Sequence, residues 1–300
     1  MTHYPLPNSM FDNFEKSLID TSGATINLVK GGQGFPLLLL HGYPQTHLMW
    51  HKIAPILAKS FTVIAPDLRG YGDSSKPEGG ANHINYSKRA IAQDQVEVMS
   101  ELGYEEFYLV GHDRGGRVAH RMALDYPNRV KKLAVLDIVP TYEMYATTNK
   151  EFATAYYHWF FLIQPYDLPE TLIGSNPEYW VGKALKQWSG NNLSAFPPEV
   201  ITEYVRCFSN RETIYASCED YRAAATIDLI HDEADMNQKI ICPVLALWGE
   251  KSIVGRNYNV LDIWRHRAIN VSGNALPCAH FAAEEVPEET YKALSEFLVK

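Results

Sequence analysis

The chain has 300 residues, of which 46% are hydrophobic, 21% charged and 12% aromatic, as is ordinary for a soluble globular enzyme. A net charge of −8 at pH 7 and a pI near 5.8 argue against nucleic acid or an anionic membrane as the main partner. A small anionic substrate is compatible with these totals, because a pocket can be locally basic on an acidic protein.

Several features indicate a cytoplasmic protein. The segment Met1–Phe11 has no basic stretch followed by a long apolar one, so we expect no signal peptide. No stretch reaches the roughly 18 consecutive apolar residues of a membrane span. The cysteines lack CxxC or metal-site spacing, and a chain of this length buries an adequate core without disulfides. We therefore expect reduced thiols at Cys207, Cys218, Cys242 and Cys278.

Segments typical of strands and helices alternate through the first half of the chain. Apolar residues at helical spacing predict a helix over Tyr86–Leu102, ended by Gly103, and another over Gly115–Tyr126. This alternation predicts an α/β fold with a mostly parallel sheet and helices on both faces. The short apolar runs that predict strands covered on both faces are Pro36–Leu40, Phe61–Ala65, Phe107–Val110 and Leu133–Leu136.

The pattern changes after Pro140. The following residues are rich in Tyr, Trp and Phe and indicate several helices. Strand character returns at Pro243–Trp248, and Pro287–Val299 is predicted as a closing amphipathic helix. We expect one core domain made of residues 1–140 and 236–300, interrupted by a helical cap domain of residues 141–235.

The segment Leu109–Gly116, LVGHDRGG, places Asp113 between small residues, after a predicted strand and at the head of a predicted helix. This is the nucleophile elbow of the α/β-hydrolase fold, with Asp where Ser usually stands. The glycines suit a strained turn, and the helix N-terminus favours the ionised carboxylate. Asp is also a good N-cap residue, so the octapeptide alone leaves an ordinary helix start open.

Two further segments follow predicted strands. The loop His41–Pro44, with Tyr43 as its candidate residue, is expected to supply a backbone N–H to the anion site, joined by the N–H of Arg114. The segment Asp67–Ser74, DLRGYGDS, is interpreted as structural, with glycines that turn the chain and charges that pair locally.

His280 lies late in the chain, just before the last predicted helix. The order nucleophile, acid, histidine is the one expected of this fold. The acid is Asp137, directly after the strand Leu133–Leu136, or Glu250, after the later strand, and we favour Asp137.

A carboxylate nucleophile determines which bonds the site can break. An Asp that attacks a saturated carbon forms an alkyl ester on the enzyme, so its targets are carbons with a leaving group, in alkyl halides or epoxides. Water must then cleave the ester, with His280 as general base and Asp137 steadying the imidazole. This chemistry implies no metal ion and no organic cofactor.

Two arginines narrow the substrate class. Arg114 is adjacent to Asp113, and Arg117 lies one helical turn beyond it on the same face. One carboxylate beside two guanidiniums leaves surplus positive charge, which suits a small carboxylate gripped bidentately by arginine. Alternatively, Arg117 points outward and pairs with a surface acid.

The sequence resembles the fluoroacetate dehalogenases, the haloacetate-specific branch of the α/β-hydrolases, through nearly its whole length. The first two of the motifs that carry the resemblance fit epoxide hydrolases as well, and the cap motifs are more specific. The motifs are HGYPQTHLMW (His41–Trp50), GHDRGGRV (Gly111–Val118), VLDIVPTYE (Val135–Glu143), YHWFFLIQP (Tyr157–Pro165) and CEDYRA (Cys218–Ala223).

The resemblance implies a role for each matching residue. It implies that Asp113 is the nucleophile, Asp137 the acid and His280 the base, and that Arg114 and Arg117 bind the substrate carboxylate. It further implies a halide site and an additional pocket tryptophan, on the residues His158, Trp159, Tyr221 and Trp188. The implied reaction is hydrolysis of haloacetates to glycolate and halide. Aromatic residues of the helix at 156–161 are also expected to pack against the core.

Two other functions stay open. An epoxide hydrolase also uses an elbow Asp and an HGxP loop, and its proton donors are cap tyrosines, for which Tyr142, Tyr157 and Tyr221 are candidates here. A ligand-binding protein on a hydrolase fold would typically lack a triad member, whereas this sequence has candidates for all three. The sequence is compatible with a homodimer through the cap and does not predict a preference among halides.

Overall fold

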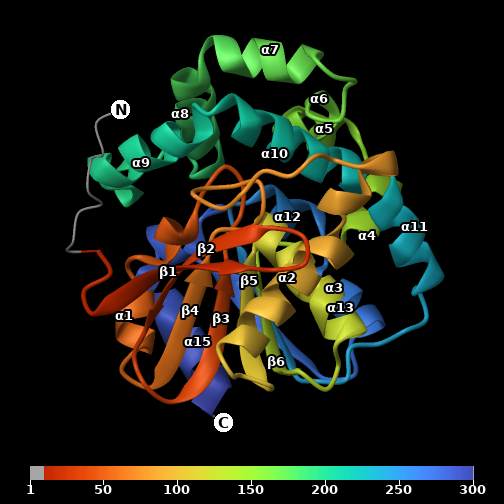
Figure 1. Ribbon diagram of the computed structural model, residues 1–300. Helices are drawn as coiled ribbons and strands as arrows, with labels where there is room; N and C mark the ends of the chain where they lie inside the picture. Colours follow the sequence, from red (N-terminus) through yellow and green to blue (C-terminus); the bar gives the residue numbers. More distant parts are fainter. Residues whose placement is uncertain (1–9, 300) are drawn as a thin grey trace.

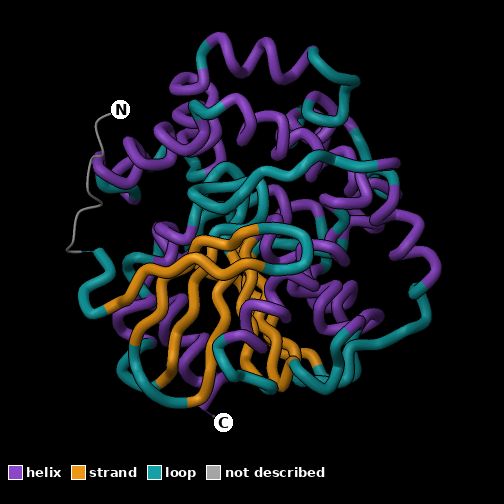
Figure 2. The backbone as a smooth tube through the Cα atoms, in the orientation of Figure 1, coloured by secondary structure: helices purple, strands orange, loops and turns teal. Residues whose placement is uncertain are grey.

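The computed structural model describes residues 10–299 (Figures 1 and 2). The expectation for Met1–Phe11 therefore concerns mostly residues outside this range. Within it, no helix combines the length and the apolar character needed to cross a membrane. The cysteines at 207, 218, 242 and 278 are buried and form no disulfide in the structure.

One twisted sheet organises the described residues, and its eight strands run in the order β1-β2-β4-β3-β5-β6-β7-β8. Neighbouring strands from β4 through β8 in this order pair parallel, while β2 pairs antiparallel with both β1 and β4. The predicted α/β fold with a mostly parallel sheet is thus confirmed. The strands are β1 Phe14–Asp20, β2 Thr25–Gly31, β3 Phe35–Leu40, β4 Phe61–Pro66, β5 Phe107–His112, β6 Val130–Leu136, β7 Val244–Gly249 and β8 Val271–Leu276.

Helices cover both faces of the sheet. The helices α2 and α3 lie on one face, where α3 packs on β5 and β6, and α15 lies on the other face (Figure 1). The predicted helix at 86–102 begins after its N-cap Ser87 and ends before Gly103, which has a φ of 82°. The α-helices before β6 and after β7 are α1 Ala54–Leu57, α2 Lys88–Glu101, α3 Asp113–Asp125, α12 Ile253–Asn257, α13 Val260–Arg267, α14 Ala282–Glu285 and α15 Pro287–Val299. The 3-10 helices in these parts are η1 His47–Trp50 and η2 Ala81–Tyr86.

The stretch between β6 and β7 is helical in the described residues. Its first helix begins at Thr141 and its last ends at Ala234. Figure 1 shows α7 to α10 on the side of the sheet from which the elbow helix α3 starts. The helices are α4 Thr141–Ala146, α5 Lys150–Ala155, α6 His158–Phe161, α7 Leu168–Ser175, α8 Pro177–Trp188, α9 Pro198–Phe208, α10 Arg211–Ala224 and α11 Ile227–Ala234, with η3 Leu193–Ala195.

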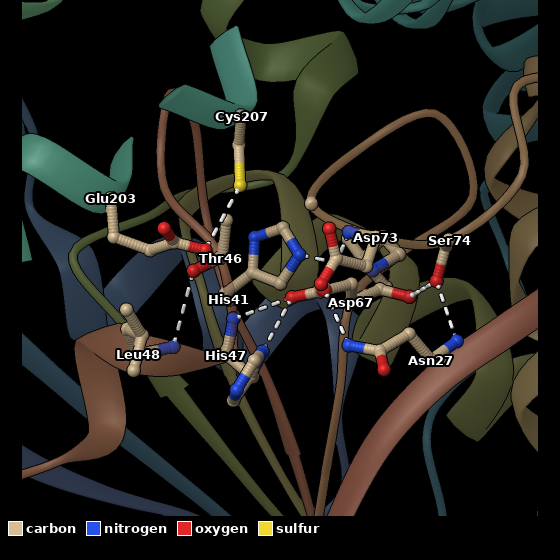
Figure 3. A network of polar contacts seen from close by, with 12 residues as sticks. Asn27, His41, Thr46, His47, Leu48, Asp67, Asp73, Ser74, Glu203 and Cys207 are labelled. Carbon is tan, nitrogen blue, oxygen red and sulfur yellow. Dashed lines mark hydrogen bonds and ion pairs between the residues drawn. The ribbon is translucent and has the colours of Figure 1, made fainter. Parts of the chain in front are cut away.

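The segment Asp67–Ser74 follows β4 and is structural, but its charges pair with distant residues, so the expectation of local pairing was wrong. The Asp67 carboxylate accepts hydrogen bonds from His47 Nδ1 at 2.8 Å and from Asn27 Nδ2 at 2.8 Å (Figure 3). Arg69 donates to Asp94 on α2, with Nη2 2.6 Å from Oδ1. These contacts fix the ends of β2 and β4 beside the HGYP loop.

Candidate active site

Asp113 occupies a strained turn between β5 and α3. Its φ is 47°, in the left-handed region that is costly for a residue with a side chain. A Cβ on Gly115 would lie 2.4 Å from the His41 carbonyl oxygen, and one on Gly111 would lie 2.5 Å from the Gly115 carbonyl oxygen. The tight approach of strand, turn and helix therefore requires the glycines, as the elbow motif predicts.

The Asp113 carboxylate faces the site rather than capping its helix. The N-cap of α3 is His112, and Asp113 Oδ1 instead accepts a hydrogen bond from the Tyr43 backbone N–H at 2.9 Å. The other oxygen, Oδ2, lies 3.9 Å from His280 Nε2. The N-cap interpretation of the octapeptide is therefore wrong, because this carboxylate bonds to a different loop.

Asp113 is buried and stays ionised. Burial raises the pKa of its carboxyl group, but His280, His112 and the two arginines outweigh burial and hold the pKa at about 2. A carboxylate with a low pKa in a dry environment is charged at neutral pH and is poorly solvated, which favours nucleophilic attack.

The structure brings His280 together with Asp137. The imidazole Nδ1 lies 2.6 Å from Asp137 Oδ2, and Asp137 Oδ1 accepts from Ser252 Oγ at 2.6 Å and from the Gly249 N–H at 3.0 Å. Burial lowers the pKa of His280, but Asp137 and Asp113 outweigh it and raise the pKa above its ordinary value. Glu250 is exposed, so the geometry favours Asp137 as the partner of the imidazole.

Arg114 is buried, but its charge is not surplus. Its Nε and Nη2 donate to the two oxygens of Asp220, at 2.8 and 3.0 Å, and Nη2 also donates to the Asp220 carbonyl oxygen at 3.0 Å. Asp220 further accepts from Lys88 and from Tyr71. The expectation that both guanidiniums add unpaired positive charge is therefore wrong for Arg114.

Arg117 is buried beside the elbow rather than paired at the surface, so the outward-pointing alternative is wrong. Its Nη1 donates to the Val139 carbonyl oxygen at 2.9 Å and to Thr141 Oγ1 at 3.2 Å, and its Nη2 contacts Met144 Sδ. Among the described residues it has no carboxylate partner. Burial lowers the pKa of Arg117, an effect that the nearby Arg114 adds to and Asp113 opposes.

The two arginines leave different nitrogens free. Arg114 Nη1 and Arg117 Nε are buried and have no hydrogen-bond partner among the described residues. An isolated buried N–H is costly, so each of these groups is suited to an acceptor from a bound ligand.

The residues of the implied halide site are brought together by α6 and α10. His158, Trp159 and Tyr221 are buried, and each has a polar side-chain atom without a partner among the described residues: Nδ1, Nε1 and the phenol oxygen. Burial lowers the pKa of His158 to about 3, so its imidazole is neutral at ordinary pH. The Trp188 ring lies 4.3 Å from the His158 ring, and its N–H likewise has no partner in the part of the chain that the structure describes.

Comparisons with known proteins agree with the geometry of this site. A family model described as alpha/beta hydrolase fold matches residues 36–287. The chain belongs to the α/β-hydrolase family. Most of the chain lies within this match, which contains the elbow, the 3-10 helices and the strands β4 to β8, whereas β1 and β2 precede it.

Individual relatives of this α/β-hydrolase cover nearly its whole length. A fluoroacetate dehalogenase from Burkholderia sp. is 46% identical, over 96% of this chain and 95% of that protein, which confirms the resemblance inferred from the motifs. A soluble epoxide hydrolase from Corynebacterium sp. (strain C12) is 36% identical, over 89% and 91%. A crystal structure of a Nostoc sp. PCC 7120 protein has a TM-score of 0.94 and 70% identity, over 95% of this chain and 98% of that one.

Two side chains of the α/β-hydrolase site were not predicted from sequence. Asp220, which binds Arg114, is 106 residues away from it, so no local spacing could indicate the pair. Tyr156 is buried, and its hydroxyl lies 3.3 Å from His280 Nδ1. Both residues lie within or beside the motifs that carry the family resemblance, but only the folded structure shows which side chains they contact.

Proposed function

We propose that this α/β-hydrolase is a cytoplasmic haloacetate dehalogenase, which hydrolyses fluoroacetate or chloroacetate to glycolate and halide. The observation that carries the proposal is Arg117, a buried guanidinium near Asp113 that has a free Nε and no carboxylate partner among the described residues. A buried cation without such a partner favours a small anionic ligand. A neutral haloalkane or epoxide would leave the guanidinium unpaired.

The first step of the proposed reaction forms an ester on Asp113. Arg114 Nη1 and Arg117 Nε hold the substrate carboxylate, and this fixes the α-carbon near the nucleophile. Asp113 Oδ1 is held by the Tyr43 N–H, so Oδ2 is the oxygen that attacks. The bond from Oδ2 to the α-carbon forms as the carbon–halogen bond breaks.

The leaving halide carries the displaced electron pair and must be stabilised as it forms. Imidazole N–H, indole N–H and phenol O–H are compact donors, and His158, Trp159 and Tyr221 supply them from the cap side. Fluoride depends most on such donors, because the small anion loses more hydration than chloride.

The second step hydrolyses the ester. His280 removes a proton from water, and the hydroxide attacks Asp113 Cγ. The charge then develops on Oδ1, where the Tyr43 N–H already points. Asp137 stabilises the imidazolium, which returns its proton to the departing glycolate oxygen. The regenerated Asp113 carboxyl releases the remaining proton, so each turnover yields glycolate, one halide and one proton.

The domain organisation is part of the proposal. We infer that residues 141–235 form a cap that closes the site over a core of residues 1–140 and 236–300. Support comes from the origin of the side chains, since His158, Trp159 and Tyr221 belong to the first range and Asp113 and His280 to the second. A homodimer through this cap is an extension that light scattering would test.

Epoxide hydrolysis is the alternative function, and the 36% identity to the Corynebacterium epoxide hydrolase supports it. Of its three candidate proton donors, Tyr221 is fully buried, whereas Tyr157 is 38% exposed and Tyr142 is partly exposed. Of these three candidates, Tyr221 is therefore the one that is buried in the described part of the chain. Arg117 also has no role in binding a neutral epoxide.

One assay series tests the two functions together. Purified protein is given fluoroacetate, chloroacetate or styrene oxide, and halide release and diol formation are measured. Halide release without styrene oxide opening supports the dehalogenase. Opening of styrene oxide that survives Arg117→Met, with no halide release, would replace it by an epoxide hydrolase.

A further inference from the structure

Tyr221 supplies the phenol among the donors of the implied halide site. Its side chain is fully buried, and its hydroxyl has no partner among the described residues. The guanidinium carbon of Arg114 lies 4.1 Å from the centre of its ring. The site therefore contains a phenol next to a cation that can stabilise a phenolate.

A departing halide does not use the acidity of this phenol. Halide is a stable anion, so hydrogen bonds suffice and no proton has to move. Burial and the charge of Asp113 raise the pKa of Tyr221 well above its ordinary value, while Arg114 opposes them. Tyr221 therefore keeps its proton in the resting enzyme and has it available for a leaving group that is more basic than halide, such as an alkoxide.

An oxirane is a leaving group of this kind, and the arginines restrict which oxirane fits. Resting on the dehalogenase function proposed above, we propose that the same site also opens α,β-epoxycarboxylates, with Tyr221 donating its proton to the ring oxygen. The smallest member is glycidate, oxirane-2-carboxylate. Glycidate differs from fluoroacetate in two ways. An oxygen replaces fluorine on the α-carbon, and a methylene group bonded to both that oxygen and the α-carbon closes the three-membered ring. Arg114 Nη1 and Arg117 Nε bind its carboxylate as they bind that of a haloacetate.

The reaction balances with water as the only co-reactant. Asp113 Oδ2 bonds to the α-carbon, the bond from that carbon to the ring oxygen breaks, and the oxygen takes the proton of Tyr221. Asp113 loses its charge in the ester, which removes one of the influences that disfavour a phenolate at Tyr221.

Hydrolysis then proceeds as for the glycolyl ester. His280 transfers one water proton to the departing C2 oxygen, and the hydroxide stays on Asp113 as a carboxyl group. That carboxyl ionises and its proton restores Tyr221. The product is 2,3-dihydroxypropanoate, with the new oxygen at C2.

The test compares chloroacetate, glycidate and its neutral amide, glycidamide, on the intact wild-type protein and on Tyr221→Phe. Chloride and dihydroxypropanoate are quantified, and label from ¹⁸O-water is located by mass spectrometry. Tyr215→Phe is the matched control, because it removes a phenol hydroxyl from the same helix, where Tyr215 contacts the Gly79 N–H outside the site.

We expect the wild type to open glycidate, to place the label at C2 over many turnovers, and to leave glycidamide nearly untouched. Tyr221→Phe should lose about 100-fold or more in glycidate opening but less than about 10-fold in chloride release, since only the oxirane needs a proton. Tyr215→Phe should change neither reaction.

Each other outcome contradicts a distinct statement. If the wild type releases chloride but does not open glycidate, this inference is overturned and the proposed dehalogenase function stands. If the wild type catalyses neither reaction, the proposed function itself is overturned. Glycidate opening that survives Tyr221→Phe, or that falls in parallel with chloride release, overturns the role of Tyr221. Label at C3 overturns attack at the α-carbon.

Discussion

The guanidinium carbon of Arg117 lies 4.6 Å from the ring centre of Trp159. This contact joins the proposed carboxylate site to the proposed halide site, because within residues 10–299 neither Arg117 Nε nor the Trp159 indole N–H has a hydrogen-bond partner. Both side chains are buried. A ligand that uses both must be short, and a haloacetate carries its carboxylate and its halogen on one carbon.

Replacing Arg117 should separate charged from neutral substrates. Arg117→Lys keeps the charge but loses the planar Nε donor, so kcat/KM for chloroacetate should fall roughly 100-fold, mainly through KM. For the neutral chloroacetamide it should change less than about threefold. Arg121→Lys is the control, one turn further on α3 and paired with Asp235. Equal losses on both substrates would show that Arg117 supports the fold rather than the carboxylate.

The breakdown of the ester should depend on the protonation of His280. Burial lowers its pKa, but Asp137 and Asp113 outweigh burial in the free protein and raise it. The base acts in its neutral form, so ester decay should rise with pH through this pKa and then level off. Esterification removes the Asp113 charge, so the pKa from ester decay should be lower than that from NMR titration of free His280. Decay that is independent of pH, or slower at high pH, contradicts His280 as the base.

The two candidate acids can be separated by matched amides. Asp137→Asn removes the charge that supports the imidazolium, so kcat for chloroacetate should fall by roughly 1000-fold or more. Glu250→Gln should stay within about twofold of the wild type, because an exposed side chain interacts weakly with a buried base. The reverse ranking in a chloride-release assay would assign the acid to Glu250.

Glu284 predicts a pH effect on stability. Its buried carboxyl group accepts from Tyr204 on α9 at 3.0 Å and from Gln45. Burial raises its pKa from 4.5 to about 8, against these donors and Lys52. Its contribution to stability is therefore fully present below the unfolded pKa and is lost as the pH rises toward about 8.

Melting temperatures at pH 5 and pH 8 measure this contribution. The wild type should lose several degrees more than Glu284→Gln over this interval, since about 1 kcal/mol shifts the melting temperature of a domain of this size by roughly 2 °C. Glu288→Gln, at an exposed position on α15, should behave like the wild type. Identical pH slopes for Glu284→Gln and the wild type contradict a raised pKa at this site.

Local sequence patterns were sufficient for the parts of the structure with short-range causes. The buried strands β3 to β7 are continuous apolar runs, and the elbow at Asp113 requires glycines at fixed spacing. By contrast, β1 and β8 are edge strands with many exposed positions, so they lack an apolar run and were not predicted. The antiparallel β2 was also missed.

Long-range pairing explains the errors within the site. The sequence places Arg114 beside Asp113 but does not reveal Asp220, which holds two of its three nitrogens. It likewise indicates that Arg117 shares a helix face with Asp113, but not that Val139 and Thr141 occupy its Nη1. These pairings depend on how the segment 141–235 and the loop after β6 fold against α3.

The most direct test of the proposed function is to trap the ester on Asp113. His280→Asn should still allow attack on chloroacetate but not hydrolysis, so one chloride should be released per protein molecule. Intact-protein and peptide mass spectrometry should then find one carboxymethyl group, on Asp113, which is absent in a double variant with Asp113→Asn. Continued turnover by His280→Asn without an adduct, or an adduct on another residue, contradicts the account.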